Sequence, residues 1–123
     1  MIRRKIDHIL SAVFPDHKKL EERIRKGKKV VVFYSRGCPA CKIYIRILLP
    51  DITGRLISHK IEVLKLNVVK HPLLFSESSS TTIPTTSIYL DGEVLDSKGG
   101  SMSYEVAVPW ILETYGINPK KSL

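Results

Sequence analysis

Apolar residues change their spacing several times along the chain, and each change predicts the start of a new element. In residues 1–15 they recur at helical spacing, which predicts a helix that ends at Pro15. A second helix should follow, with Asp16 as its N-cap and with Leu20 and Ile24 on one face. The next run, KVVVFY, is rich in β-branched and aromatic side chains and predicts a buried strand.

The middle of the chain returns to helical spacing and then to a second strand. The segment CPACKIYIRILL predicts a helix that begins near Cys38, with Pro39 at its first position. Pro50 and Gly54 are expected to kink or break this helix before GRLISHK completes it. The run KIEVLKLNVV predicts a second buried strand, and HPLLFSES predicts a short helix.

The last third of the chain predicts a hairpin and a closing helix. The segment TTSIYLDGEVLDSKGG reads as two strands joined by a turn at Asp91 and Gly92. SYEVAVPWILETYG predicts a helix that ends at Gly116, with Pro109 disturbing its first half. The order of elements requires both parallel crossovers and an antiparallel hairpin. The sequence therefore predicts an α/β fold with a mixed sheet and helices on both faces.

Length and composition are those of one folded domain, with 123 residues, of which 43% are apolar and 26% are charged. No run approaches the ~20 apolar residues of a membrane span, so none is expected. The basic start, MIRRKIDHILSAVF, lacks an uninterrupted apolar core and a small-residue cleavage site. We therefore interpret it as a mature N-terminus and expect a cytoplasmic protein.

The formal net charge of +8 predicts a solvated basic surface, and it permits contact with nucleic acid or acidic proteins. No nucleic-acid-binding motif accompanies the charge. The basic runs also contain no interleaved aromatic residues that would stack on bases. Nucleic acid is therefore not expected as a partner, whereas an acidic protein remains an alternative.

Both cysteines of the chain lie in one tetrapeptide, Cys38 to Cys41, at the predicted junction of a strand with a helix. There the helix N-terminus stabilises a thiolate on the first cysteine, and nearby Arg36 and Lys42 favour the same charge. The three-residue spacing on a helical turn keeps the two Cα atoms ~5–6 Å apart, within reach of a disulfide. The pair can therefore alternate between dithiol and disulfide.

The cysteine pair has three alternative roles. A zinc site needs about four ligands, and the histidines are scattered through the sequence, at positions 8, 17, 59 and 71. A structural disulfide that closes so small a loop constrains the unfolded chain little. Two unreactive thiols are the remaining alternative. The redox pair is the preferred interpretation, with no metal.

Three segments in the same order resemble the thioredoxin family. KKVVVFYSRGCPACK is similar to its first active-site strand and helix, VLKLNVVKHP to the segment that leaves its central strand, and TTIPTTSIYLDGEVLDSKGG to its Ile-Pro-Thr loop and hairpin. The match runs from about Gly27 to Gly116. It implies a thioredoxin-like fold with a mixed four-stranded central sheet in residues 16–118. An extra N-terminal helix in residues 1–15 and a basic tail in residues 119–123 would flank it.

The resemblance also implies roles for residues outside the cysteine pair. It implies that Pro84 follows a cis peptide bond and faces the cysteines, and that the backbone of Ile83 pairs with the substrate chain. Lys65 matches the family's partner lysine. Together with Arg36 and Lys42, it is expected to tune the pKa of the active-site thiols.

Three departures from the family pattern affect the expected chemistry. Gly37 stands where the family usually has a tryptophan, and Val32 stands where it has a buried acid. The residues between the cysteines, Pro39 and Ala40, are similar to those of glutaredoxins and some disulfide oxidases. These differences leave the direction of electron flow open.

The expected function is that of a thiol–disulfide oxidoreductase that reduces protein disulfides through Cys38 and Cys41, without a bound cofactor. The resemblance implies a flavoprotein of the thioredoxin-reductase type as electron donor, and a monomer is expected. The alternatives are a disulfide oxidase or isomerase, a glutaredoxin-like protein, and a non-catalytic binding module with the same fold.

Overall fold

The structure of the chain, a computed structural model, describes residues 17–118. The helix expected in residues 1–15, the Asp16 N-cap and the basic tail of residues 119–123 lie outside the described residues. A four-stranded sheet with the strand order β2-β1-β3-β4 forms the centre of the fold.

The sheet is mixed, as predicted. Its strands are β1 (Lys28–Tyr34), β2 (Glu62–Asn67), β3 (Thr85–Leu90) and β4 (Glu93–Gly99). Strand β1 runs parallel to β2 and antiparallel to β3, and β3 runs antiparallel to β4. Strand β1, which leads to the cysteine pair, therefore lies inside the sheet with a hydrogen-bonded neighbour on each side.

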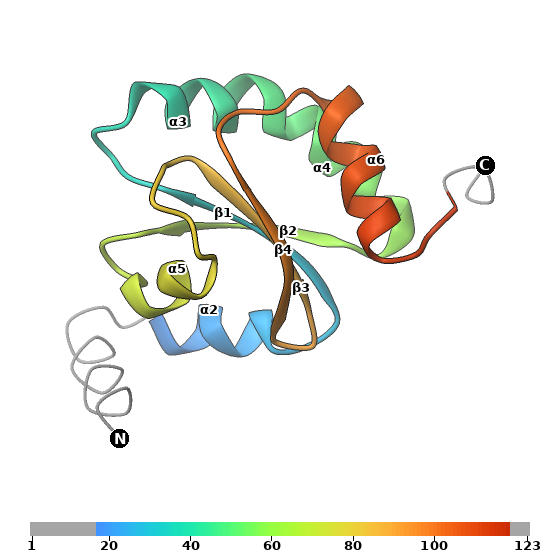
Figure 1. Cartoon of the computed structure of the whole chain (residues 1–123), viewed down its shortest axis with the longest axis horizontal. Helices are drawn as coiled ribbons and strands as arrows, with labels where there is room; N and C mark the ends of the chain where they lie inside the picture. The colour runs from blue at the N-terminus through green and yellow to red at the C-terminus, as the bar shows by residue number, and fades with distance from the viewer. Residues whose placement is uncertain (1–16, 119–123) are drawn as a thin grey trace.

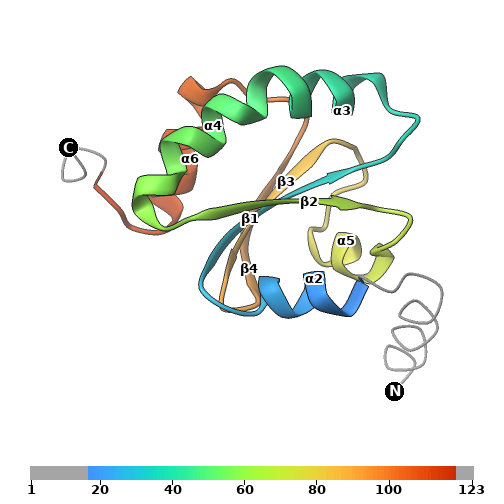
Figure 2. The ribbon, with the colours of Figure 1, turned by 180° about the vertical axis from the view of Figure 1, so that it is seen from behind.

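Helices cover both faces of this sheet (Figures 1 and 2). One face carries α3 (Pro39–Ile43), α4 (Leu49–Leu56) and α6 (Tyr104–Thr114). The opposite face carries α2 (His17–Ile24) and α5 (Pro72–Glu77). No helix within residues 17–118 is long and apolar enough to cross a membrane.

Strand β1 contributes to two separate cores because successive side chains of a strand point to opposite faces. Val30 and Val32 belong to the core under α4 and α6, and Val31 and Phe33 belong to the core under α2 and α5. All four side chains are fully buried. This double burial explains the uninterrupted apolar run in the sequence, and it fixes the strand end that carries the cysteines.

The helix after the cysteines is continuous but irregular. A π-helical turn, η1 (Tyr44–Leu48), joins α3 to α4, and the N–H of Leu49 bonds to the carbonyl of Tyr44 five residues back. In a regular α-helix a proline ring collides with the carbonyl four residues earlier, and this wider turn accommodates Pro50. The irregularity predicted at Pro50 is thus a π-helical turn. The break predicted at Gly54 is wrong, because Gly54 lies within α4.

The hairpin turn forms at the predicted residues. Asp91 and Gly92 both have positive φ angles, 49° and 91°, which the tight turn between β3 and β4 requires. The Asp91 carboxylate also accepts a hydrogen bond from the N–H of Gly27, at 2.7 Å. In the closing helix, Pro109 lies inside α6 without ending it.

Candidate active site

The two cysteines form a disulfide where β1 passes into α3. Their Cα atoms are 5.2 Å apart, within the range that a disulfide tolerates. Cys38 is partly exposed, whereas only 1% of Cys41 is exposed. A substrate that approaches the pair from solution therefore reaches the sulfur of Cys38 first.

Cys38 is the N-cap residue of α3, with extended backbone angles. Its sulfur accepts a hydrogen bond from the N–H of Cys41, at 3.1 Å. After reduction, the same N–H and the positive end of the helix dipole stabilise a thiolate on Cys38. Pro39 occupies the first position of the helix, as predicted, where its missing N–H costs no helical hydrogen bond.

The peptide bond between Ile83 and Pro84 is cis, as the resemblance implied. The carbonyl oxygen of Ile83 lies 3.9 Å from the sulfur of Cys38. Pro84 is buried, and Ile83 remains partly exposed. The fold thus brings both of these residues to the disulfide, although the two segments lie far apart in the sequence.

Several contacts hold the loop that carries Pro84. The hydroxyl of Thr85 donates a hydrogen bond to the carbonyl of Thr82 at 2.5 Å. The N–H of Gly100 donates to the carbonyl of Pro84 at 2.7 Å. A Cβ atom at Gly99 would overlap the hydroxyl oxygen of Thr82. The end of β4 therefore lies directly against this loop and limits where it can sit.

Positively charged side chains border the disulfide on the side of Cys41. They line a pocket of about 350 Å³, formed by Tyr34, Ser35, Arg36, Cys41, Lys42, Ile45 and Arg46. Arg36 and Lys42 lie beside the disulfide, as their sequence positions indicated. Sequence reasoning missed Arg46. The sequence signal that could have identified Arg46 is its four-residue spacing from Lys42, because this spacing places two side chains on the same side of a helix.

The position of the family's buried acid holds the fully buried Val32. In the sheet Val32 pairs with Lys65 of β2 on one side and with Thr86 of β3 on the other. Lys65 is exposed, and it lines a different cavity, of about 510 Å³, between α4 and β2. Of the three residues expected to tune the thiols, only Lys65 does not line the pocket at Cys41.

A buried hydroxyl pair lies behind the disulfide. Tyr44 follows Cys41 by one helical turn and is fully buried, and its hydroxyl oxygen lies 2.9 Å from that of Thr86. Burial raises the pKa of Tyr44, and the hydrogen bond with Thr86 offsets part of this effect. Sequence reasoning missed this pair because the contact depends on which residue of β3 faces the helix.

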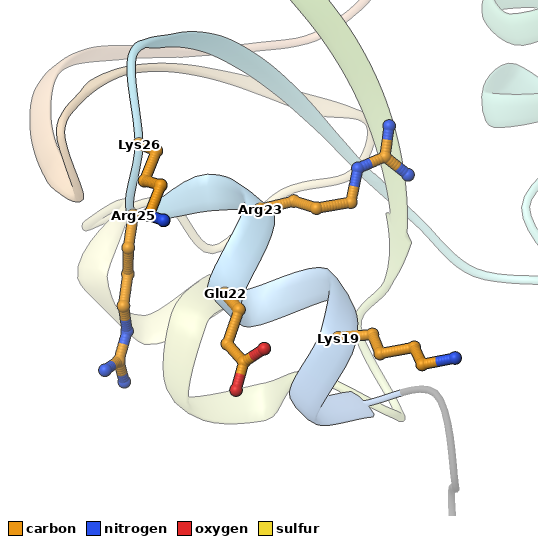
Figure 3. Close-up of a pocket in the computed structure, with 5 residues that line it drawn as sticks. All are labelled: Lys19, Glu22, Arg23, Arg25 and Lys26. Atoms are coloured by element: carbon orange, nitrogen blue, oxygen red, sulfur yellow. The ribbon is translucent and has the colours of Figure 1, made fainter.

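A second cluster of cations lies around α2 and the turn after it. It borders a cavity of about 590 Å³, lined by Lys19, Glu22, Arg23, Arg25 and Lys26. Figure 3 shows Arg23 and Lys19 extending to one side of α2 and Arg25 and Glu22 extending in another direction, so that the side chains do not meet at a common point. Arg23 is also engaged, because its guanidinium lies 2.7 Å from the carboxylate of Glu62. This cavity does not assemble a ligand site.

Metal ligands are the remaining kind of candidate site. Within residues 17–118, no group of three or more His, Cys, Asp or Glu side chains is placed to hold a metal ion.

The chain matches known proteins over most of its length. A family model described as Thioredoxin matches residues 12–113. The thioredoxin of Rickettsia typhi is 32% identical over 82 residues, which cover 67% of this chain and 76% of that protein. The thioredoxin of Staphylococcus haemolyticus is 32% identical over 80 residues, or 65% of this chain and 75% of that one.

A solved structure has the same fold. The oxidised thioredoxin of Plasmodium falciparum, determined in solution, matches with a TM-score of 0.62 at 19% sequence identity. The match covers 80% of this chain and 90% of that structure.

Proposed function

The chain belongs to the thioredoxin family, and from this premise we propose that it reduces disulfide bonds in proteins. Family membership and the neighbouring cysteines support thiol–disulfide oxidoreductase chemistry in general. One observation carries the proposal further. The sulfur of the partly exposed Cys38 accepts a hydrogen bond at a helix N-terminus, while Cys41 is buried behind it.

The first step is an attack by the Cys38 thiolate on one sulfur of a substrate disulfide. A bond forms between Cys38 and that sulfur, and the sulfur–sulfur bond of the substrate breaks. The other substrate sulfur leaves as a thiolate and takes a proton from water. We propose that the backbone of the substrate chain docks at the carbonyl of Ile83, which lies 3.9 Å from the Cys38 sulfur.

In the second step Cys41 attacks Cys38. A bond forms between the two cysteine sulfurs, and the bond between Cys38 and the substrate breaks. The proton of Cys41 passes to the departing substrate thiolate. Two electrons have then moved to the substrate, and the protein carries the Cys38–Cys41 disulfide.

Another cycle needs an external donor of two electrons. We assign this role to a flavoprotein of the thioredoxin-reductase type, and the substrates are proteins that contain disulfides. The proposed setting is the cytoplasm, and the proposed active form is a monomer. Residues 16–118 are the proposed catalytic domain, with residues 1–15 as a helical extension and residues 119–123 as a basic tail.

Insulin reduction with dithiothreitol as electron donor tests this function. The wild-type protein should accelerate the precipitation of the released insulin B chain, and Cys38→Ser should abolish the acceleration. Unchanged precipitation with the wild-type protein would leave a non-catalytic binding module as the better interpretation.

A disulfide oxidase is the second candidate, and two observations favour it. The active site has cations at Arg36 and Lys42, and the position of the family's buried acid holds Val32. Both features stabilise the reduced, thiolate form and so make the disulfide a stronger oxidant. The reduction potential separates the two directions of electron flow.

A further inference from the structure

The pocket beside Cys41 concentrates positive charge and lacks negative charge. Three of its seven lining residues are cations: Arg36, Lys42 and Arg46. All three are exposed, and none forms an ion pair with a carboxylate within residues 17–118. Between Glu22 and Asp51 the sequence contains no acidic residue at all. The pocket therefore presents unneutralised charge to whatever chain binds there.

We propose that this pocket binds an acidic side chain of the substrate, next to its reactive cysteine. The inference rests on the proposed function and adds a substrate class to it, namely disulfides flanked by aspartate or glutamate. A carboxylate supplies the charge that the three cations lack. Tyr34 and Ile45, two of the four other lining residues, offer apolar surface to the aliphatic part of such a side chain.

The position of the pocket limits which substrate residue can reach it. The substrate cysteine bonds to Cys38, and the pocket begins at Cys41, whose Cα atom is 5.2 Å from that of Cys38. An extended chain advances ~3.3 Å per residue, so one or two residues cover this distance. The residues immediately before or after the substrate cysteine are therefore the ones that meet the pocket.

The cation cluster around α2 allows the effect of charge beside the disulfide to be separated from the effect of the net charge. The side chains around α2 diverge (Figure 3), and Arg23 already pairs with Glu62. This cluster also lies on the other face of the sheet from α3 (Figures 1 and 2). Arg25 is exposed there and lines the α2 cavity. It offers a matched control, because Arg25→Gln removes the same charge as Arg46→Gln but far from the disulfide.

The test uses short peptides whose single cysteine is joined to 2-thiopyridine, a neutral leaving group. Within each pair the peptides differ only by Glu or Gln beside the cysteine, placed before it in one pair and after it in the other. The Cys38 thiolate attacks the peptide sulfur, the bond to thiopyridine breaks, and the released thiopyridone is followed by its absorbance. Each rate is divided by the rate of the same peptide with 2-mercaptoethanol, which corrects for intrinsic reactivity.

With the reduced wild-type protein, the Glu peptide of at least one pair should react about three times faster than its Gln partner, or more. Exposed charge pairs have effects of this order, and salt screens them. The ratio should therefore decline as salt is added. Arg46→Gln should bring the ratio towards one, Arg46→Lys should preserve it, and Arg25→Gln should leave it unchanged.

Equal rates for Glu and Gln peptides in both pairs at low salt would overturn the proposal. So would an equal loss of the ratio in Arg25→Gln and Arg46→Gln, because net charge alone would then explain it. Insulin reduction separates this inference from the proposed function. A preference for Glu peptides without insulin reduction would overturn the proposed reductase function and support the acidic-residue pocket. Equal rates for Glu and Gln peptides together with insulin reduction would support the reductase function and overturn the pocket.

Discussion

The sulfur of Cys38 lies 3.9 Å from the carbonyl oxygen of Ile83, although 45 positions separate the two residues in the sequence. This contact joins the strand-to-helix turn that carries the cysteines to the loop that enters β3. After reduction, a substrate disulfide that reaches Cys38 would thus meet its thiolate and a backbone acceptor at the same place.

The first prediction concerns the ionisation of Cys38. Its sulfur accepts the Cys41 N–H at the start of α3, and this position should lower the pKa of the Cys38 thiol below the free-cysteine value of ~8.5. Thiolate absorbance measured against pH checks this for the reduced protein. Arg36→Gln should raise the pKa again, because it removes a nearby positive charge. A Cys38 that ionises at the free-cysteine value would show that the helix start does not act on it.

The second prediction concerns the reduction potential. Stabilising the thiolate favours the reduced protein, and ~1.4 kcal/mol corresponds to ~30 mV for a two-electron couple. We expect a potential less negative than the value of about −270 mV that is typical of thioredoxin. Equilibration with glutathione measures it. A potential well below that reference would mean that the nearby positive charges do not determine the reduction potential of the cysteine pair.

The third prediction concerns the contact between the end of β4 and the loop that carries Pro84. A Cβ at Gly99 would overlap the hydroxyl oxygen of Thr82, one residue before Ile83. Gly99→Ala should therefore displace the loop, lower the free energy of unfolding by ~1 kcal/mol and slow the attack of Cys38 on substrates.

Gly54→Ala is the matched control for that variant. Its Cβ would meet open space inside α4, so it should raise the free energy of unfolding by ~0.5–1 kcal/mol and leave the attack unchanged. Chemical denaturation and the thiopyridyl assay measure both effects. Equal behaviour of the two variants would show that the Thr82 contact does not position the loop.

Some features of the fold and of the site follow from short stretches of the sequence. The hairpin turn at Asp91 and the helix start at Pro39 were predictable, because each depends on the local backbone preference of one or two residues. The cis bond before Pro84 was expected only through the family resemblance, since only ~5–6% of the peptide bonds before proline are cis in folded proteins. These features agree with the structure.

Other features depend on tertiary packing and left no local signal. The Tyr44–Thr86 hydrogen bond requires the register of β3 as well as the rotation of the helix. The break predicted at Gly54 failed because a helix packed on a core tolerates glycine, whose cost is only ~1 kcal/mol. Lys65 pairs with Val32 in register, yet its side chain is exposed and lines the cavity between α4 and β2.

The fourth prediction concerns Tyr115, whose hydroxyl joins the end of α6 to the sheet. It donates to the carbonyl of Tyr89 at 2.5 Å, and it lies 3.2 Å from the carbonyl of Lys29, the residue that pairs with Tyr89. Tyr115→Phe should lower the free energy of unfolding by ~1 kcal/mol, since it removes this bond. Tyr104→Phe is the matched control, because no hydrogen bond of the Tyr104 hydroxyl occurs within residues 17–118.

The effect of Tyr115→Phe on the free energy of unfolding should depend on pH. Burial raises the pKa of Tyr115 in the folded protein. In the unfolded chain Tyr115 loses its proton near pH 10, whereas in the folded protein it stays protonated. Its contribution to stability is therefore complete below pH ~10 and declines above it. Tyr115→Phe should lose stability less steeply than the wild type there, and identical slopes would contradict this origin.

In the proposed mechanism Cys38 attacks the substrate and Cys41 completes the reaction. Mass spectrometry of mixed disulfides, after each single-serine variant is mixed with an oxidised protein substrate, tests this order of attack. We expect Cys41→Ser to accumulate a covalent complex through Cys38 and Cys38→Ser to accumulate almost none, because Cys41 is buried. Equal trapping by the two variants would contradict the assignment of roles.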